Sequence, residues 1–508
     1  MLKKIHLKSC IILIFSLLNF AAKAQLKLPT YFSNDMILQR EQVVKIWGWN
    51  APSQEVAIKF NNKEYKTTAS VDSVWRINLP LMKAGGPYDI NIRSNGKEVS
   101  FVNVYFGDVW FCSGQSNMNF KVKLVQNHDK EIQDAEYPQI RQLDVSRVTA
   151  LSPQLNLKSA KWSIANSNTI DDFSAVAWFF AKELYKKEGI PIGIIHSSWG
   201  GSPIETFMSV DALKDFPSAQ KKIAVISPDY INGIKARNKA LIAAAPPGTK
   251  NPEGFINVDN HYPTFVYNAM IAPFFSNPIK GVIWYQGENN IGLNSCYTYE
   301  EMLTNMITSW RTSWQNSNLP FLVVQLANYG KVTEKPESAG WAVVQEAQSN
   351  VSKKLDYVGL AVTNDIGDPN DIHPTNKQDV GKRLAYQARK IAYRQKNLVV
   401  QGPIVSKIRK LKDRFKLSYE NVGSGLMAKD SANQLKGFAI AGQDNVFHRA
   451  NASIKGNKVI VWSEDVLQPI NLRYTFESSP AAINFYNKEG FPAVPFRTDK
   501  LKDASKSR

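Results

Sequence analysis

Short stretches in which hydrophobic and polar residues alternate fill the first part of the chain, from Leu26 to Tyr105. Alternation with a period of two residues is typical of strands that bury one face. Turn signals such as Gly85-Gly86-Pro87 and Asn95-Gly96 separate the stretches. The pattern therefore predicts an N-terminal β-sandwich-like module over residues 25–105. Its expected strands are Val43–Trp49, Val56–Phe60, Trp75–Leu79, Tyr88–Arg93 and Glu98–Val104.

After Gly107 the pattern changes to continuous apolar runs that alternate with amphipathic segments. A short, wholly apolar run is typical of a strand that is buried on both faces of a parallel sheet. Strands alternating with helices predict a three-layer α/β domain over residues 106–400, with a parallel five-stranded sheet. The expected strands are Val109–Cys112, Ile192–His196, Val282–Tyr285, Phe321–Leu326 and Tyr357–Val362. The expected helices are Ala175–Lys187, a helix opened by a capping box from Thr298 to Glu301, and Asn376–Arg394.

Two further segments complete the organisation. Residues 211–260 have no strand period and contain an Ala-Ala-Ala-Pro-Pro-Gly run, so we expect an insertion that caps or borders the binding site. From about residue 401 to 508 the chain is β-rich again, which predicts a C-terminal β-sandwich-like module. The strands expected there are Phe415–Tyr419, Gly437–Ala441, Val459–Trp462 and Asn471–Tyr474.

The N-terminus has the pattern of a secretory signal. Lys3, Lys4 and Lys8 precede an apolar run from Cys10 to about Ala22, and Ala22-Lys23-Ala24 suits cleavage before Gln25. The run is shorter than the roughly 20 residues that cross a bilayer as a helix. We expect residues 1–24 to be removed and the mature chain to be exported, to the periplasm or the exterior, without an integral membrane segment.

Charge and cysteine usage narrow the classes of partner. The formal net charge is +18, but the lysines are scattered rather than clustered beside aromatic residues, so no nucleic acid is expected as a partner. A positive charge favours acidic glycans. Cys112 and Cys296 remain after cleavage, and they could pair in an oxidising compartment, although Cys112 could equally be a core residue. The sequence carries no signal for an oligomeric state.

One serine stands out at the end of the first expected parallel strand. The segment Gly107–Met118 reads GDVWFCSGQSNM, and its apolar part leads into a polar turn that carries Ser116. A buried strand that delivers a serine onto a tight turn is one way in which hydrolases present a nucleophile. Taken alone, the segment is better explained as a strand end with an ordinary polar turn, and only the matching segments later in the chain favour a nucleophile.

The carboxyl ends of the other strands carry further unusual residues, and ligands bind at that edge of a parallel sheet. Gly200 and Gly201 follow the second strand, where the absence of side chains lets a backbone N–H approach a ligand. Gln286, Glu288 and Asn289 follow the third strand. Asp365 and Asp368 follow the fifth, before the run Asp371-Ile372-His373-Pro374 opens the last helix.

Together these residues supply the parts of a serine esterase. His373 would take the proton of Ser116 during attack on an acyl carbonyl, and a carboxylate would orient its imidazole. The Ser116 amide, an amide at Gly200 or Gly201, and the Gln286 side chain would stabilise the oxyanion. No metal and no cofactor is expected, because the histidines after the signal are not spaced as ligands on one element. These are His128, His196, His261, His373 and His448.

The segments GQSNM, GGSPIE, WYQGEN and DIHP resemble those of SGNH-type esterases, specifically the sialate O-acetylesterase family of carbohydrate deacetylases. FSNDMILQR near the start, YNAMIAPFF before the third strand, and GFAIAG, IVWS, VLQPINLRY and PFRTD near the end are also similar. The resemblance therefore covers nearly the whole mature chain. It implies an SGNH-hydrolase-like α/β domain between the two β modules.

The resemblance also implies roles at matching positions. Ser116 corresponds to the nucleophile and His373 to the base, while Gly201 and Gln286 correspond to oxyanion donors. Many SGNH enzymes have an aspartate three residues before the histidine, and this chain has Asn370 there. We therefore expect Asp371 to be the orienting acid, with Asp368 and Glu288 as alternatives.

The resemblance implies an acetylated carbohydrate as substrate. O-acetylated sialic acid is the first choice, and acetylated xylan or xyloglucan is the alternative. A non-catalytic glycan-binding protein is the competing class, and the presence of every catalytic segment argues against it. A lipid esterase is a weaker alternative, because the chain has no long apolar lid.

Overall fold

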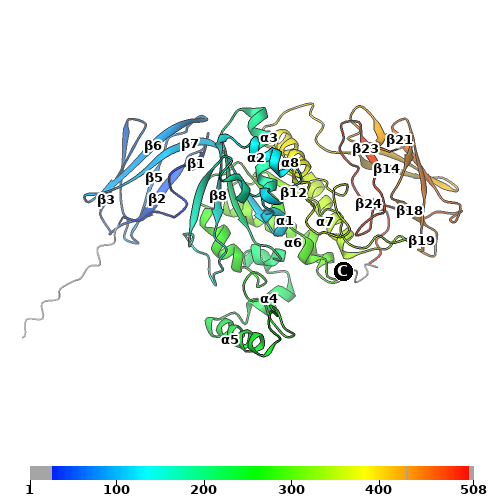
Figure 1. Cartoon of the computed structure of the whole chain (residues 1–508), viewed down its shortest axis with the longest axis horizontal. Coiled ribbons are helices and arrows are strands. Elements are labelled where there is room, and N and C mark those ends of the chain that lie inside the picture. Colours follow the sequence, from blue (N-terminus) through cyan, green and yellow to red (C-terminus); the bar gives the residue numbers. More distant parts are fainter. Residues whose placement is uncertain (1–25, 431–432, 503–508) are drawn as a thin grey trace, which may run out of the picture.

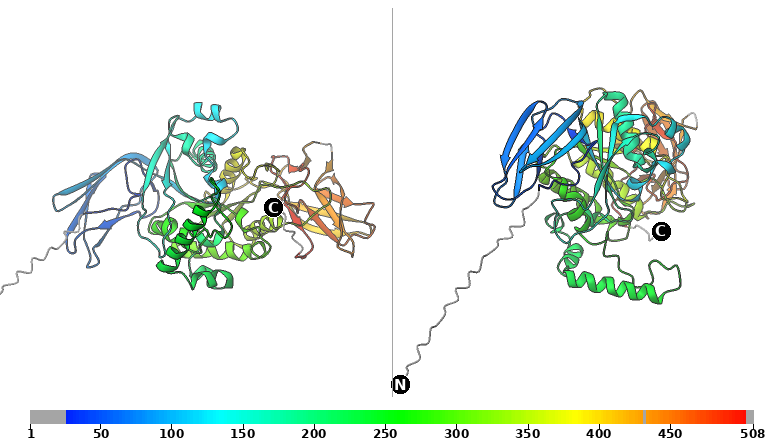
Figure 2. Two further views of the ribbon diagram at one scale, coloured as in Figure 1. Left: turned by 60° about the horizontal axis from the view of Figure 1, so that its bottom comes forward. Right: turned by 60° about the vertical axis from the view of Figure 1, so that its left-hand side comes forward.

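The computed structural model describes residues 26–430 and 433–502, so the expected signal at residues 1–24 lies outside the described residues. A central α/β part stands between two β-rich ends, and the insertion with α4 (Pro217–Ile223) and α5 (Pro228–Ala244) projects from it (Figures 1 and 2). In residues 26–430 and 433–502, no helix is long and apolar enough to cross a membrane.

The N-terminal strands form two sheets around a shared core. One sheet pairs β2 with β5, and the other joins β1, β7, β6, β3 and β4. Buried side chains from both sheets, such as Trp75 and Ile58, belong to the main hydrophobic core. The bounds are β1 (Ile37–Gln39), β2 (Lys45–Trp49), β3 (Glu55–Phe60), β4 (Lys63–Thr68), β5 (Val74–Asn78), β6 (Gly85–Ser94) and β7 (Lys97–Gly114).

Strand β7 belongs to both the N-terminal and the central sheet. Its first half pairs with β6, and its second half lies between β10 and β11 in parallel register. The buried carboxylate of Asp108 marks the crossing. It accepts hydrogen bonds from Arg40 Nε at 3.0 Å and from the Tyr393 hydroxyl at 2.8 Å. The strand that ends at the serine turn is therefore held along its whole length.

The mixed α/β fold with a mostly parallel sheet is confirmed, but the expected number of five parallel strands is wrong. The order β13-β12-β11-β7-β10-β8-β9 contains six parallel strands and the antiparallel edge strand β9. The bounds are β8 (Tyr137–Val145), β9 (Ala160–Ala165), β10 (Ile192–Ser198), β11 (Gly281–Tyr285), β12 (Phe321–Val324) and β13 (Val358–Ala361).

Strand β8 was missed because two polar residues interrupt its buried apolar residues. Arg141 is 1% exposed and donates to the Pro138 carbonyl oxygen, and Gln142 accepts a hydrogen bond from the Ser174 amide. Buried polar groups are tolerated when they find such partners. A search for apolar runs cannot detect them.

Helices cover both faces of the sheet. Successive residues of a strand point to opposite faces, and Trp110 of β7 contacts Phe180 of α3, whereas Phe111 contacts Trp310 of α6. Helix α8 packs on α3, and α7 packs on α6. The bounds are α1 (Ser116–Asn119), α2 (His128–Gln133), α3 (Ala175–Glu188), α6 (Tyr299–Ser313), α7 (Gly340–Lys354) and α8 (Lys377–Ile391).

The three expected helices are present as α3, α6 and α8, but the capping box is wrong. The Thr298 hydroxyl donates to the Ser295 carbonyl oxygen at 3.1 Å instead of capping α6. Helix α7 was not expected. Its buried Gln345 and Gln348 bond to the main chain of Leu326, so they break the amphipathic pattern.

The C-terminal part consists of two larger sheets that share one core. The sheet β14-β15-β21-β20-β17 contributes Leu417 and Val459, and the sheet β19-β18-β22-β24 contributes Ile440 and Leu472. The bounds are β14 (Ile404–Lys410), β15 (Arg414–Glu420), β16 (Leu426–Ala428), β17 (Gln434–Leu435), β18 (Phe438–Ala441), β19 (Phe447–Arg449), β20 (Asn451–Lys455), β21 (Lys458–Trp462), β22 (Asn471–Tyr474), β23 (Phe485–Asn487) and β24 (Phe496–Arg497).

We predict that Gly381→Ala destabilises the protein. A Cβ atom at Gly381 of α8 would lie 2.5 Å from Phe179 Cβ of α3, so the two helices must separate. Such overpacking typically costs about 1–3 kcal/mol of unfolding free energy. Gly233→Ala in α5 is the matched control, because its Cβ meets nothing within 4 Å. It should be neutral or stabilising by up to about 1 kcal/mol. Denaturant unfolding of both variants checks this, and equal effects would contradict it.

Candidate active site

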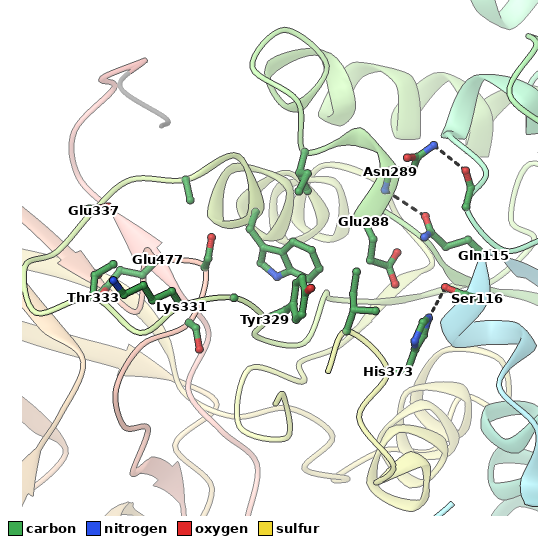
Figure 3. A pocket seen from close by; sticks show the side chains of 18 residues that line it. Gln115, Ser116, Glu288, Asn289, Tyr329, Lys331, Thr333, Glu337, His373 and Glu477 are labelled. Carbon is green, nitrogen blue, oxygen red and sulfur yellow. Dashed lines mark hydrogen bonds between the residues drawn. The ribbon is translucent and has the colours of Figure 1, made fainter. Parts of the chain in front are cut away.

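The serine turn and the histidine loop meet at the carboxyl end of the sheet. Ser116 begins α1 directly after β7, and His373 lies in the loop after β13. Their side chains are in contact, with His373 Nε2 2.8 Å from Ser116 Oγ (Figure 3). This distance suits proton transfer between the two groups.

Two glycine contacts bring the neighbouring loops close to Ser116. A Cβ atom at Gly114 would lie 2.0 Å from the carbonyl oxygen of Tyr285, so only glycine lets β7 end beside β11. A Cβ atom at Gly200 would lie 3.3 Å from Ser116 Cβ, so the loop after β10 passes directly over the serine. Gly201 lines the same pocket as Ser116 and His373.

The carboxylates of the three candidate acids contact different groups. Asp371 Oδ1 is 3.6 Å from His373 Nδ1 and accepts the His373 backbone N–H at 2.8 Å. Asp368 Oδ1 instead accepts the backbone N–H of Asn370. Glu288 Oε1 accepts a hydrogen bond from Asn117 Nδ2 at 2.6 Å. Of the three, Asp371 is the one whose carboxylate contacts the imidazole.

The His373 imidazole is shifted towards its neutral form. Burial lowers its pKa below the ordinary 6.5, the Asp371 charge opposes this shift, and the Lys377 charge adds to it. A neutral imidazole is the form that can accept a proton. The ring also stacks on Phe120, with centroids 6.4 Å apart.

The structure does not bring Gln286 into the pocket. Its side chain is fully buried and donates to Asn290 Oδ1 at 2.7 Å, while its Oε1 accepts the Tyr299 hydroxyl. Asn289 does line the pocket, and its Nδ2 donates to the carbonyl oxygen of Gly201 at 2.7 Å. Asn289 therefore holds the glycine loop in place. Gln115, the residue before the serine, also lines the pocket.

A buried polar network lies beneath the serine turn, and the sequence interpretation missed its centre, Asn117. Asn117 accepts from Lys377 Nζ at 2.6 Å and donates to Glu288 and to the Ile372 carbonyl oxygen. It thereby joins the serine turn to the loops that carry Glu288 and His373. Asn117 stands inside the GQSNM segment, so its position next to Ser116 was a signal that could have been used.

Burial pushes both charged members of this network towards neutrality. It lowers the pKa of the Lys377 ammonium from 10.5 to about 7, and it raises the pKa of the Glu288 carboxyl. Glu288 Oε2 is buried and has no hydrogen-bond partner among the described residues. Glu288 also lines the pocket, so the buried network reaches the pocket wall.

The pocket itself is a cavity of about 550 Å³, a size usual for small-molecule sites. No residue of the expected capping insertion, 211–260, lines it. Asn260 touches the site indirectly, since its Nδ2 donates to the Gly200 carbonyl oxygen at 2.8 Å. The far wall comes instead from residues 329–341 and 477–479.

The two cysteines and His196, which the sequence also singled out, have structural roles. Cys112 and Cys296 are both buried free thiols, so they do not pair. His196 Nδ1 lies 2.6 Å from Asp144 Oδ1 inside the sheet. Within the described ranges, no group of three or more His, Cys, Asp or Glu side chains could hold a metal ion.

Comparison with known proteins identifies the family. The family model described as "Carbohydrate esterase, sialic acid-specific acetylesterase" matches residues 106–236 and 218–390. The chain belongs to this family. The resemblance noted in the sequence is thereby confirmed, and the chain is a carboxylic ester hydrolase.

Individual members of the sialic acid-specific acetylesterase family show how far the similarity extends. Human sialate O-acetylesterase is 31% identical over 417 residues, 75% of this chain and 74% of the human one. The rat protein is 31% identical over 445 residues, 78% of this chain and 79% of its own. The crystal structure of a carbohydrate acetylesterase from Xanthomonas citri superposes with a TM-score of 0.83 at 35% identity. It covers 94% of this chain and 100% of its own.

We predict that buried Lys377 makes stability depend on pH. Its pKa is near 7 in the folded state and 10.5 ordinarily, so the unfolded state binds more protons between these values. Unfolding free energy should therefore rise with pH across this window, with a slope of at most about 1.4 kcal/mol per pH unit.

Lys377→Met should lack the pH dependence of the unfolding free energy that comes from Lys377. The measurement is denaturant unfolding of wild type and Lys377→Met at several pH values between 6.5 and 9.5, at constant ionic strength. The wild-type minus variant difference should increase with pH, and parallel curves would contradict the expectation.

Proposed function

We propose that this chain hydrolyses O-acetyl esters of carbohydrates, with Ser116 as nucleophile and His373 as general base. The observation that carries the proposal is the 2.8 Å contact between His373 Nε2 and Ser116 Oγ in the lining of a ligand-sized cavity. The SGNH-type assignment of the central domain is part of the same proposal.

The reaction takes two steps. Ser116 Oγ attacks the acetyl carbon while His373 Nε2 takes its proton, and this proton then goes to the departing sugar oxygen. Water next attacks the acetyl-serine, gives a proton to His373, and releases acetate as Ser116 Oγ is protonated again. Asp371 stabilises the imidazolium that forms in each step. It is the acid whose carboxylate approaches Nδ1, at 3.6 Å.

The oxyanion donors we propose are the backbone N–H groups of Ser116 and Gly201. Both residues line the pocket, and Asn289 fixes Gly201 through its carbonyl oxygen. Gly200 lets the loop pass close to Ser116. One such donor commonly contributes about 3 kcal/mol to transition-state stabilisation. The Gln286 side chain supports the glycine loop from behind, because its Nε2 donates to the Ser202 carbonyl oxygen at 3.2 Å as well as to Asn290 Oδ1.

The substrate has two candidates. The names of the curated relatives make O-acetylated sialic acid the first. The pocket lining carries little net charge, because Lys331 offsets Glu337, Glu477 is paired with Arg449, and burial raises the pKa of Glu288. A neutral glycan such as acetylated xylan or xyloglucan is therefore the second candidate. Exposed lysines more than about 8 Å away are screened at physiological salt, so the positive net charge gives little preference for an acidic sugar.

Export and the domain division belong to this proposal as well. The sequence pattern of residues 1–24 supports removal of a secretory signal. We propose that residues 106–400 form the catalytic domain and that residues 25–105 and 401–508 form the flanking β modules. An exported enzyme would meet glycans outside the cytoplasm.

We predict that Ser116→Ala and His373→Ala each lower acetate release by several orders of magnitude, since each removes a group that takes part in every turnover. The substrates are an aryl acetate, O-acetylated sialic acid, acetylated xylan and acetylated xyloglucan. Circular dichroism checks that the variants fold. If wild type releases no acetate from any substrate but still binds glycans, the chain is a glycan-binding protein instead.

We predict that Asp371→Asn lowers kcat/KM more than Asp368→Asn, because Asp371 contacts the imidazole and Asp368 contacts a turn amide.

In wild type, kcat/KM should fall only below pH 6.5, since His373 must be neutral to act as the base and burial lowers its pKa.

The same pair of variants separates the effects of the two carboxylates on pH dependence. The Asp371 charge raises the pKa of His373, so Asp371→Asn should move the acid limb of the pH–rate profile to lower pH. Asp368→Asn should leave the limb in place. A larger loss in Asp368→Asn would transfer the role of the orienting acid to Asp368.

A further inference from the structure

The pocket extends far beyond the position of an acetyl group. Ser116 and His373 stand at one end, and Lys331, Thr333 and Glu477 stand at the other (Figure 3). A cavity of about 550 Å³ has room for a ligand of drug size, whereas an acetyl group has only three non-hydrogen atoms. The part of the pocket away from Ser116 therefore lies beyond the acetyl group and has room for the rest of the substrate.

The C-terminal β-rich part builds the distant wall. Glu477 and Ser478 follow β22 and line the pocket directly. The Ser478 carbonyl oxygen accepts the backbone N–H of Tyr329 at 3.0 Å. The loop of residues 329–339, which follows β12, is thereby bonded to the C-terminal part of the chain.

Arg449 of β19 binds the same loop through hydrogen bonds. Its guanidinium forms a bidentate ion pair with Glu477, in which Nη2 lies 2.9 Å from Oε2. Nη2 also donates to the Thr333 carbonyl oxygen at 2.9 Å, and Nε donates to that of Glu334 at 3.3 Å. Glu477 is only 4% exposed, whereas the Arg449 side chain is 36% exposed, so the ion pair is shielded from solvent on the Glu477 side. Arg449 thus connects the C-terminal core to the pocket-forming loop.

The lining of this end has the chemistry of a sugar site. Tyr329 and Trp341 form an aromatic corner, with ring centroids 5.5 Å apart at 50°. Trp341 is fixed by a 2.8 Å hydrogen bond from its Nε1 to the Ala327 carbonyl oxygen. Aromatic rings offer apolar faces to the C–H groups of a pyranose, and the hydroxyl and charged groups beside them can bond its hydroxyls. Those groups belong to Lys331, Thr333, Glu337 and Ser478.

We infer that this end of the pocket is a distal subsite for a further sugar residue of an acetylated oligosaccharide, and that Arg449 positions it. We define the distal subsite as Tyr329, Lys331, Glu337, Trp341 and Ser478. The inference rests on the proposed function, and it adds that the enzyme selects acetylated oligosaccharides over acetylated monosaccharides. The C-terminal part is accordingly a wall of the active site rather than an independent binding module.

The test compares two ligands that carry the same acetylated sugar. For a neutral glycan these are O-acetylated xylotetraose and O-acetylated xylose. For a sialate they are O-acetylated sialyllactose and free O-acetylated sialic acid. The pair is chosen by which glycan wild type deacetylates, and kcat and KM are measured separately for both members.

Wild type should prefer the oligosaccharide by about tenfold or more in kcat/KM, which corresponds to about 1.4 kcal/mol of additional binding. Tyr329→Ala and Arg449→Met should each bring this ratio close to one, chiefly through a higher KM for the oligosaccharide. Arg414→Met is the matched control, because Arg414 pairs with its neighbour Asp413 in the same β-rich part. It should keep the wild-type ratio.

Different failures have different meanings. If wild type deacetylates both ligands with equal kcat/KM, or if Tyr329→Ala retains the wild-type ratio, the distal subsite is overturned while the esterase function stands. If wild type releases no acetate from either ligand or from an aryl acetate, the proposed function fails, and the inference fails with it. Thermal melting identifies an Arg449→Met variant that does not fold, and Tyr329→Ala then decides the question alone.

Discussion

The close passage of Gly114 past Tyr285 is the constraint on which the site depends. Strand β7 lies between β10 and β11, and a Cβ atom at its last residue would lie 2.0 Å from the Tyr285 carbonyl oxygen. Because glycine stands there, β7 can end level with its neighbours and turn at once into Ser116. The loops after β10 and β11 then converge on the same point. A central strand with two close neighbours is what brings the proposed nucleophile, a glycine loop and a buried carboxyl to one place.

Precise placement of the serine and the histidine relies on the buried network around Asn117. One amide side chain contacts Lys377, Glu288 and the main chain of Ile372, so it couples the three loops that form the site. Taking charges out of water is costly, and such networks are tolerated only when their members are well bonded. Here burial shifts both the ammonium and the carboxyl towards neutral forms, which lessens that cost. Glu288 itself lines the pocket, so the network also contributes to the pocket wall.

The two ends of the pocket have different origins in the chain. The reactive end comes from the parallel sheet, whose strand ends are rigid. The distal end comes from a long loop that the C-terminal part holds through Arg449 and Ser478. Arg497 adds a further bidentate pair to Glu346 of α7, so the C-terminal part is locked to the central domain at more than one point. If the distal subsite binds a further sugar as proposed, this division lets ester cleavage and glycan selection be set by different elements.

The sequence by itself determined the parts of the protein whose cause is local. Continuous apolar runs located five of the parallel strands, Gly189 and Pro191 ended α3, and the short segments around Ser116 and His373 marked the proposed catalytic pair. It missed β8 and α7, because the polar residues Arg141, Gln142, Gln345 and Gln348 occupy buried positions in them. Their partners are main-chain groups of Asn103, Ser174 and Leu326, which lie far away in the sequence. Only the tertiary structure separated Asp371 from Asp368, turned Gln286 away from the pocket, and brought residues 477–479 to its far wall. Hydrogen-bond partners and pocket walls depend on which distant segments fold together, and no local pattern of residues encodes that.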